Sequence, residues 1–229
     1  FLQNKHEVAN IYLCQGYNNF EQGNYKSAED YYQLALKLTT EEKDSQLIAD
    51  CNNSLGILAT VQGTFGEAIT YYKESISAYE NLQDIKGLAT TYHNMAMLQV
   101  DLEKWKEAGE SYQSALEYAQ LDGNLELMGL IHLNRAELAM KLYDFAMAQA
   151  FCRHALKVFG RLNSQTRIAE AYKFLGCIYS RQKKWKEAGR LFERSIEIND
   201  SVNNLLGASE ARYEYGLMYS SKNDKDNAK

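Results

Sequence analysis

The sequence predicts an all-α solenoid made of successive antiparallel helix pairs. Small residues recur every 40 positions without a gap, at Gly16, Gly56, Ala96, Ala136, Gly176 and Gly216. Alanine recurs with the same period, at Ala28, Ala68, Ala108, Ala148, Ala188 and Ala228. The 229-residue chain also contains no proline, a residue that would interrupt helix interiors. A fixed period of this length is typical of repeat architectures, in which each repeat is one supersecondary unit.

The spacing inside one period predicts how two helices cross. The alanine follows the small residue by 12 positions in every repeat. An aromatic residue stands three positions before it, at Tyr25, Phe65, Trp105, Phe145 and Trp185. Because helices approach closely only where their contact residues are small, we expect the small residue to face the alanine of the second helix, with aromatic rings filling the space beside them. Each hairpin then leaves an apolar face that only the next hairpin can cover.

Turn residues place the helices in order along the chain. In the first repeat we expect a helix over about 10–22, a turn at Gly23 and Asn24, and a second helix from Tyr25 to about Thr39. Asn24, Thr64 and Asp144 occupy the same turn position and are expected to cap the second helices, which Lys104 and Lys184 cannot do. Five good N-cap residues recur between repeats and mark the next first helix: Asp44, Asp84, Asn124, Ser164 and Asn204.

The fourth and sixth repeats depart from this pattern. Arg135 stands where other repeats have leucine or methionine, and Cys152 replaces the usual aromatic residue. Arg135 either packs its stem and keeps its head in solvent, or lines a binding site with a paired charge. The sixth repeat has a first helix rich in large side chains: Tyr213, Tyr215, Leu217, Met218 and Tyr219. This face needs a further hairpin or another chain to cover it.

The order of residues in one period resembles the tetratricopeptide repeat. The second repeat has Leu55-Gly56, then Phe65, Ala68 and Tyr72. The resemblance covers essentially the whole chain, and its long repeat is similar to those of polarity adaptors, kinesin light chains and bacterial peptide-sensing regulators. It implies a right-handed superhelix forming a single domain, with five full repeats (about 9–48, 49–88, 89–128, 129–168 and 169–208) and a truncated sixth (209–229). Because the sequence starts at Phe1 and stops inside the sixth repeat, we expect a fragment of a longer protein.

Composition excludes several classes of function. The formal net charge of −5 argues against nucleic-acid binding, and no apolar stretch is long enough to cross a membrane. The one basic run, 181–184, is interpreted as a solvated corner between helices. No metal-ligand spacing, glycine-rich phosphate loop or nucleophile motif is present, so we expect neither an enzyme nor a bound cofactor or metal. The four cysteines suit reduced thiols in a cytoplasmic protein.

In the family that the chain resembles, the first helices line a concave groove. Carried over to this sequence, the residues expected to contact a partner are Tyr17, Asn53, Ile57, His93, Asn94, Met97, Asn134, Glu137, Lys141 and Lys173. Asparagine offers a donor and an acceptor and so suits an extended peptide backbone; the alternative is an ordinary solvated polar residue. The cations with which some family members hold a C-terminal carboxylate are absent, so that specificity is not expected.

These features together predict a protein-interaction scaffold that binds a peptide or helical segment of a protein partner in its groove. Two alternatives stay open: a peptide-sensing regulatory domain of a larger signalling or transcription regulator, and a self-assembly module that forms a homo-oligomer through its terminal repeats. Groove charge is expected to be uneven. Acidic residues belong to the first half (Glu21, Asp50, Asp101) and basic residues to the second (Lys141, Lys173, Arg181).

Overall fold

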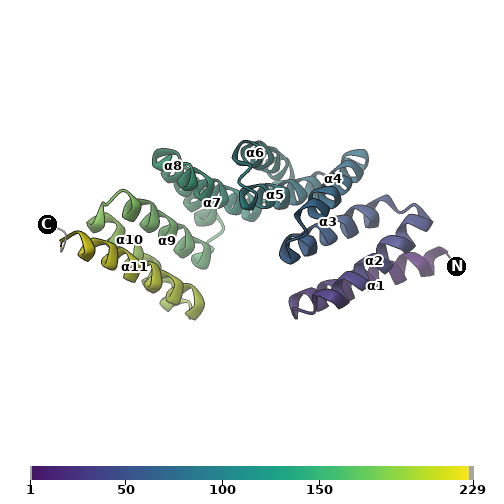
Figure 1. Ribbon diagram of the computed structural model, residues 1–229, viewed down its shortest axis with the longest axis horizontal. Coiled ribbons are helices and arrows are strands. Elements are labelled where there is room, and N and C mark those ends of the chain that lie inside the picture. The colour runs from purple at the N-terminus through teal and green to yellow at the C-terminus, as the bar shows by residue number, and fades with distance from the viewer. Residues whose placement is uncertain (1, 227–229) are drawn as a thin grey trace. The chain divides into compact units, whose positions relative to one another are not determined.

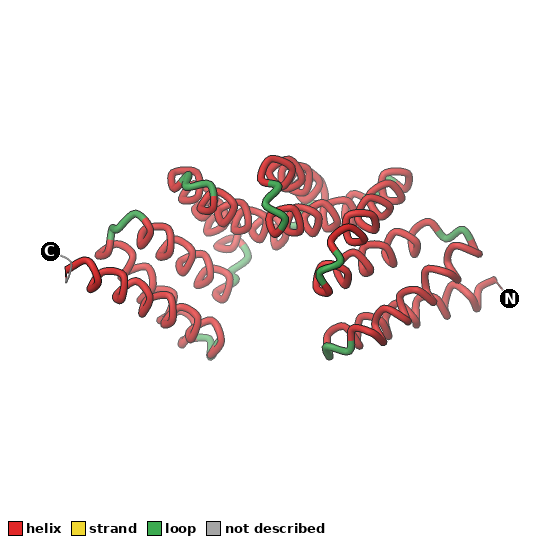
Figure 2. The backbone as a smooth tube through the Cα atoms, in the orientation of Figure 1, coloured by secondary structure: helices red, strands yellow, loops and turns green. Residues whose placement is uncertain are grey.

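The computed structural model describes the backbone of residues 2–226 and the side chains of residues 5–222, and all regular structure in this range is helical (Figures 1 and 2). The chain divides into two compact units, Phe1–Gly123 and Asn124–Lys229. The first unit contains α1 (Leu2–Glu21), α2 (Tyr25–Glu42), α3 (Ser45–Gln62), α4 (Phe65–Leu82), α5 (Ile85–Asp101) and α6 (Trp105–Asp122). The second contains α7 (Leu125–Lys141), α8 (Phe145–Arg161), α9 (Gln165–Arg181), α10 (Trp185–Ser201) and α11 (Leu205–Asp226).

Within each unit, consecutive helices pair in antiparallel fashion, which confirms the predicted all-α repeat fold. The helices of a pair pack along their length, and the second helix of one pair also packs against the first helix of the next. The phased alanines of the second helices are fully buried in all five full repeats: Ala28, Ala68, Ala108, Ala148 and Ala188. The predicted 40-residue phase is therefore correct. In the first repeat, however, the helices are longer than expected, since α1 begins at Leu2 and α2 ends at Glu42.

The phased glycines Gly16, Gly56 and Gly176 face aromatic rings, whereas we expected them to face alanines. A Cβ atom built on Gly56 would lie 2.6 Å from the Tyr72 ring, and one on Gly176 would lie 2.8 Å from the Phe192 ring. Tyr72 and Phe192 are themselves almost fully buried. Glycine therefore stands at this position because a Cβ atom would occupy space that the ring fills. The ring is the large residue that sets how closely the two helices approach.

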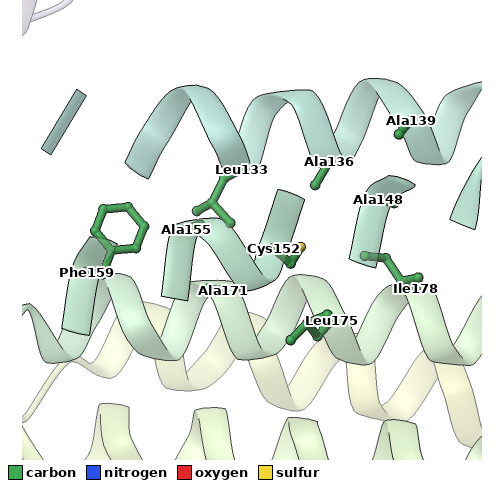
Figure 3. Packing of buried hydrophobic residues seen from close by; sticks show 10 residues of the cluster. All are labelled: Leu133, Ala136, Ala139, Ala148, Cys152, Ala155, Phe159, Ala171, Leu175 and Ile178. Carbon is green, nitrogen blue, oxygen red and sulfur yellow. The ribbon is translucent and has the colours of Figure 1, made fainter. Parts of the chain in front are cut away.

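In the core of the second unit, the residues at the equivalent helix crossing are an alanine and a cysteine in place of a glycine and a ring (Figure 3). Figure 3 shows α7 contributing Ala136 and α8 contributing Cys152, the residue that replaces the usual ring. Both are fully buried, so a Cβ atom on α7 accompanies a smaller side chain on α8. Arg135 is half-buried on the same helix, and its guanidinium lies 4.4 Å from the centre of the Phe151 ring. Burial lowers the pKa of this guanidinium.

Every inter-helix turn contains one residue with positive φ, and these residues recur every 20 positions. They are Gly23, Lys43, Gly63, Gln83, Glu103, Gly123, Tyr143, Asn163, Lys183 and Asn203. A residue in the left-handed conformation ends a helix because its backbone N–H and the N–H of the next residue donate to carbonyl groups of the last helical turn. Only three of the ten are glycine, and a residue with a side chain is strained in this conformation by roughly 1 kcal/mol.

Four of the five predicted caps between repeats form, and the predictions within repeats are partly wrong. Side chains of Asp44, Asp84, Asn124 and Asn204 accept a backbone N–H three residues later, at 3.0–3.2 Å. Ser164 precedes α9 without such a bond. Among the within-repeat candidates, Asp144 caps α8 by accepting from the Met147 amide at 3.0 Å, but Asn24 and Thr64 do not cap α2 and α4. The Thr64 hydroxyl instead donates to the Ala59 carbonyl at the end of α3.

Candidate binding surfaces

In the first unit, three apolar residues at one repeat position form a strip along neighbouring helices. Tyr17 lies on α1, Ile57 on α3 and Met97 on α5, and α3 contacts both α1 and α5. The Tyr17 side chain is 58% exposed and the Met97 side chain is 45% exposed, while Ile57 is half-buried. The 40-residue period gives this alignment, because equivalent residues of stacked first helices point to the same face. We call these three residues the apolar strip.

Two of the predicted asparagines lie one turn from the apolar strip and bind each other. The Asn94 Nδ2 donates to the Asn53 Oδ1 at 3.2 Å, which links α5 to α3. Among the described residues, the Asn94 Oδ1 and the Asn53 Nδ2 have no hydrogen-bond partner. The asparagine pair thus presents one acceptor and one donor, which is the pattern that an extended peptide backbone can satisfy. Both side chains are half-buried, so the pair is partly ordered before any ligand arrives.

His93 differs from its predicted place on the binding surface. Only 9% of the residue is exposed, and its ring centre lies 6.1 Å from that of Tyr112 on α6. Burial lowers the pKa of His93 to about 4, so the imidazole is neutral at physiological pH. A buried neutral ring next to a tyrosine belongs to the packing between α5 and α6. We therefore leave His93 out of the surface proposed below.

Of the acidic residues predicted for the first half of the groove, Asp50 is already engaged inside the first unit. The Tyr79 hydroxyl donates to the Asp50 carboxylate at 2.5 Å, and burial raises the pKa of that carboxyl. Glu21 and Asp101 are exposed. These two carboxylates, rather than Asp50, are free to attract a basic residue of a partner.

The second unit contains a cavity of about 760 Å³ that is lined by residues of α7, α9, α10 and α11. Three predicted residues line it: Glu137, Lys141 and Lys173. Apolar side chains also line the wall, notably Met140, Phe174 and Leu217. Asn134 is half-buried on α7 and does not line this cavity.

Two of the three lysines that line this cavity are already paired with carboxylates. Lys141 lies 3.7 Å from Glu137, and Lys173 donates to Glu210 of α11 at 2.5 Å. The thiol of Cys177 donates to Glu214, also on α11, and burial raises its pKa to about 12. A ligand that used these lysines would have to share them with the protein's own acids. Glu210 stands at the same repeat position as Asp50 but was not among the predicted contact residues.

The exposed face of α11 also differs from expectation. Met218 is 3% exposed and Tyr215 is half-buried, so these two residues pack inside the unit. The large side chains that remain exposed on α11 are Leu205, Leu206, Tyr213, Leu217 and Tyr219. Leu217 and Tyr219 line two different cavities, whereas Leu205 and Leu206 give the start of α11 an exposed apolar surface.

The described residues give no support for a metal site or a membrane span. Among them, no three histidine, cysteine, aspartate or glutamate side chains are grouped so that they could hold a metal ion. No described helix combines the length and the apolar character that crossing a membrane requires.

The chain is similar in sequence to one repeat family and to a transcriptional activator. A family model described as tetratricopeptide repeat matches residues 7–81 and 127–201. The transcriptional activator NprA of Geobacillus stearothermophilus is 19% identical over 192 residues, covering 80% of this chain and 46% of that protein. The chain spans less than half the length of the curated relatives it matches.

Two solved structures share the fold. One is a signal transduction ATPase with a tetratricopeptide repeat sensor from Pyrococcus horikoshii, with a TM-score of 0.84 and 16% identity over 95% of this chain and 33% of that one. The other is a Rap protein complexed with competence and sporulation factor, with a TM-score of 0.79 and 18% identity over 94% of this chain and 60% of that one.

Proposed function

Because the chain belongs to the tetratricopeptide-repeat family, we propose that it is a protein-interaction module that binds a peptide or helical segment of a partner protein. One observation carries this proposal. The apolar strip of Tyr17, Ile57 and Met97 is exposed beside an asparagine pair with an unused donor and an unused acceptor. An apolar surface can bind a side chain of a peptide ligand, and hydrogen-bonding groups beside it can bind the main chain of the same peptide.

The two features would act on different parts of one ligand. A leucine or phenylalanine of the partner would lie over Ile57 and Met97, and full burial of such a side chain contributes about 1.5–3 kcal/mol. Methionine adapts its shape to different side chains, which suits a surface that accepts related sequences. The asparagine pair would bind the partner's main chain beside that residue. Glu21 and Asp101 would favour a ligand with basic residues, mainly through faster association.

The second unit offers a further place for the same kind of ligand. Its cavity between α7, α9 and α11 has an apolar wall that includes Met140 and Phe174, and an exposed Arg181 at its edge. No carboxylate of the described residues lies within 4.0 Å of the Arg181 guanidinium. We propose that this cavity takes a large apolar side chain, with a partner carboxylate near Arg181.

The test is selection of binding peptides from a random library displayed on phage, followed by affinity measurements on variants. Asn94→Ala should raise the Kd of a selected peptide about 5- to 30-fold, mostly through faster dissociation, because it leaves a backbone group of the peptide unpaired. Met97→Ser should weaken the same peptide by a similar factor.

Two controls on α6 separate this surface from the rest of the molecule. Gln120→Ala removes an exposed amide and Glu107→Ala an exposed charge, and neither should alter affinity. If selected peptides respond to the α6 variants and ignore Asn94→Ala and Met97→Ser, the proposed surface is wrong.

A narrower form of the proposal is a peptide-sensing part of a larger regulator. It is favoured by the similarity to a transcriptional activator over 80% of this chain and by the fold shared with a tetratricopeptide repeat sensor. A sensor must change its conformation when it binds, so a selected peptide should shift the small-angle X-ray scattering profile. An unchanged profile at saturating peptide favours the plain scaffold.

Self-assembly is a separate candidate, favoured by the apolar surface of α11, on which Leu205 is 77% and Leu206 is 72% exposed. Sedimentation equilibrium over a range of protein concentrations tests it. A mass that rises with concentration and returns to the monomer value in Leu206→Glu supports assembly through α11. A constant monomer mass excludes it.

A further inference from the structure

The end of the second unit contains a cavity of about 610 Å³ between α10 and α11 that no function described so far uses. Five basic side chains line it: Lys183, Lys184, Lys186, Arg190 and Lys222. Only two acidic residues, Glu187 and Glu193, accompany them. Lys183 and Lys184 belong to the basic run 181–184, for which we expected only a solvated corner. We call the five residues the cation cluster.

The repeat fold does not require these cations, as the equivalent positions of earlier repeats show. The positions 40, 80, 120 and 160 residues earlier contain at most two basic residues in any repeat. Where a lysine does occur on the helix there, an acid four residues later accompanies it: Lys26 lies 3.1 Å from Asp30, and Lys106 lies 3.8 Å from Glu110. In the fifth repeat Arg190 replaces that acid. Like charges at this spacing on a helix repel each other, so the cluster opposes the stability of α10.

The cation cluster also lacks carboxylate partners within the described residues, although the Lys184 ammonium lies 5.6 Å from the centre of the Tyr179 ring. Among the described residues, none of its five charged groups lies within 4.0 Å of a carboxylate. Elsewhere in the second unit, Arg167, Lys173 and Arg212 do form such pairs, at distances of 2.5–2.9 Å. Within the described range, Arg181, Lys157 and Arg161 also have no carboxylate partner, but the cation cluster is where five such groups line one cavity. It leaves positive charge available for a ligand.

The charge of the whole chain makes this cluster unusual. Residues 1–123 contain 8 lysines and arginines against 18 aspartates and glutamates, and residues 124–229 contain 17 against 12. A protein with a net charge of −5 therefore has 17 of its 25 basic residues in the second unit, and five of these line one cavity. A cavity lined by one sign of charge concentrates ligands of the opposite sign.

Aromatic side chains form the wall beneath these charges. Trp185 and Tyr219 line the cavity, and the rings of Tyr215 and Tyr219 lie 4.9 Å apart. The Tyr215 hydroxyl donates to Glu193 at 2.7 Å, which occupies one of the two carboxylates. Tyr219 stays 46% exposed, so a ring or aliphatic side chain of a ligand can reach the wall.

We propose that this cavity binds an acidic segment of a protein partner, in which carboxylates flank an aromatic or large apolar residue. Lysines, which make up most of the cluster, are compact point charges that suit single carboxylates, whereas bidentate phosphate recognition favours arginine. Glu187 and Glu193 inside the cavity would repel a doubly charged phosphate more than a carboxylate. The site is separate from the apolar strip of the first unit. It shares Lys183, Trp185 and Met218 with the neighbouring cavity of the second unit.

The experiment measures fluorescence anisotropy of a labelled peptide that has one phenylalanine between runs of glutamate. Lys186→Glu/Arg190→Glu should weaken its binding by about tenfold or more, and added salt should weaken binding to the wild type. The matched control is Lys157→Glu/Arg161→Glu, which reverses two exposed cations at the same spacing on α8 and should change affinity little. Circular dichroism confirms that both variants are folded. In a Trp105→Phe background, Trp185 is the one tryptophan, and its fluorescence should change on binding.

Further arms distinguish the possible ligands. Asn94→Ala should leave the affinity for the acidic peptide unchanged. The test of the cation cluster is therefore independent of whether the first-unit surface binds a peptide. The proposal fails if the α8 control weakens binding as much as the cluster variant. It also fails if inorganic triphosphate or a phosphotyrosine peptide binds while the glutamate peptide does not.

Discussion

The packing of Gly176 against Phe192 predicts a pair of substitutions whose effects depend strongly on each other. In Gly176→Ala the new Cβ atom would lie 2.8–3.0 Å from three atoms of a ring that is fully buried. Overpacking of this kind costs about 1–3 kcal/mol, and the better helix propensity of alanine offsets roughly 1 kcal/mol. We therefore expect Gly176→Ala to lower the free energy of unfolding by about 0–2 kcal/mol. The lower end applies if the helices shift apart, since the third repeat has Ala96 at the same position.

The second substitution removes the ring that causes this clash. Phe192→Ala alone should cost about 3–5 kcal/mol. In that background Gly176→Ala should stabilise the protein by about 1 kcal/mol, because the clash is absent and only the helix propensity remains. The matched control is Gly216→Ala, at the same position one repeat later, where a Cβ atom would meet open space. It should stabilise the protein in both backgrounds.

Urea unfolding followed by circular dichroism measures all of these variants, with comparison restricted to variants of equal slope because repeat proteins can unfold in steps. The coupling energy between the two sites should be about 1–3 kcal/mol. If Gly176→Ala has the same effect with and without the Phe192 ring, glycine is not there to make room for it, and the explanation given for the small-residue position is incorrect.

Three other predictions concern stability. Tyr143→Gly should raise the free energy of unfolding by about 1 kcal/mol, because it relieves a side chain held at φ 61°, and the urea midpoint reports it. Asp44→Ala should lower it by about 1 kcal/mol through loss of the bond to the Leu47 amide, and a wild-type midpoint would show that the cap is not structural. Because burial holds the pKa of His93 near 4, the unfolded chain binds a proton below about pH 6.5 that the folded protein does not. Stability should therefore fall by on the order of 1–3 kcal/mol between pH 6.5 and 4, and the fall should be smaller in His93→Gln.

The fold could be predicted from the sequence because its signal is repeated. One alanine at a helix crossing is weak evidence, but five at the same spacing agree on one phase, and all five are buried. What could not be predicted is which large residue faces the small one. Gly56 and Tyr72 are both part of the repeat pattern, and only their positions in space show that the ring, not Ala68, lies where a Cβ atom would be.

Within the candidate site, the repeat period predicted which residues align on neighbouring helices. It did not predict which side chains bind each other. The alignment of Tyr17, Ile57 and Met97 follows directly from the period. The bonds of Lys173 to Glu210 and of Tyr79 to Asp50 join residues at different repeat positions, so the period contains no information about them. The cation cluster was recognised only in part, as the basic run 181–184, because Lys222 comes from α11 and is far from that run in the sequence.

The left-handed residues that recur every 20 positions also limit which changes of length the chain can tolerate. A deletion of 40 residues removes one first helix and one second helix, and it rejoins surfaces that already contact each other in neighbouring repeats. A deletion of 20 residues would instead place two helices of the same kind next to each other, with apolar faces that do not match. Loss or gain of a few residues inside a helix would rotate every later side chain of that helix by about 100° per residue. Natural variants of this protein should therefore differ by whole repeats, or by residues added at the turns.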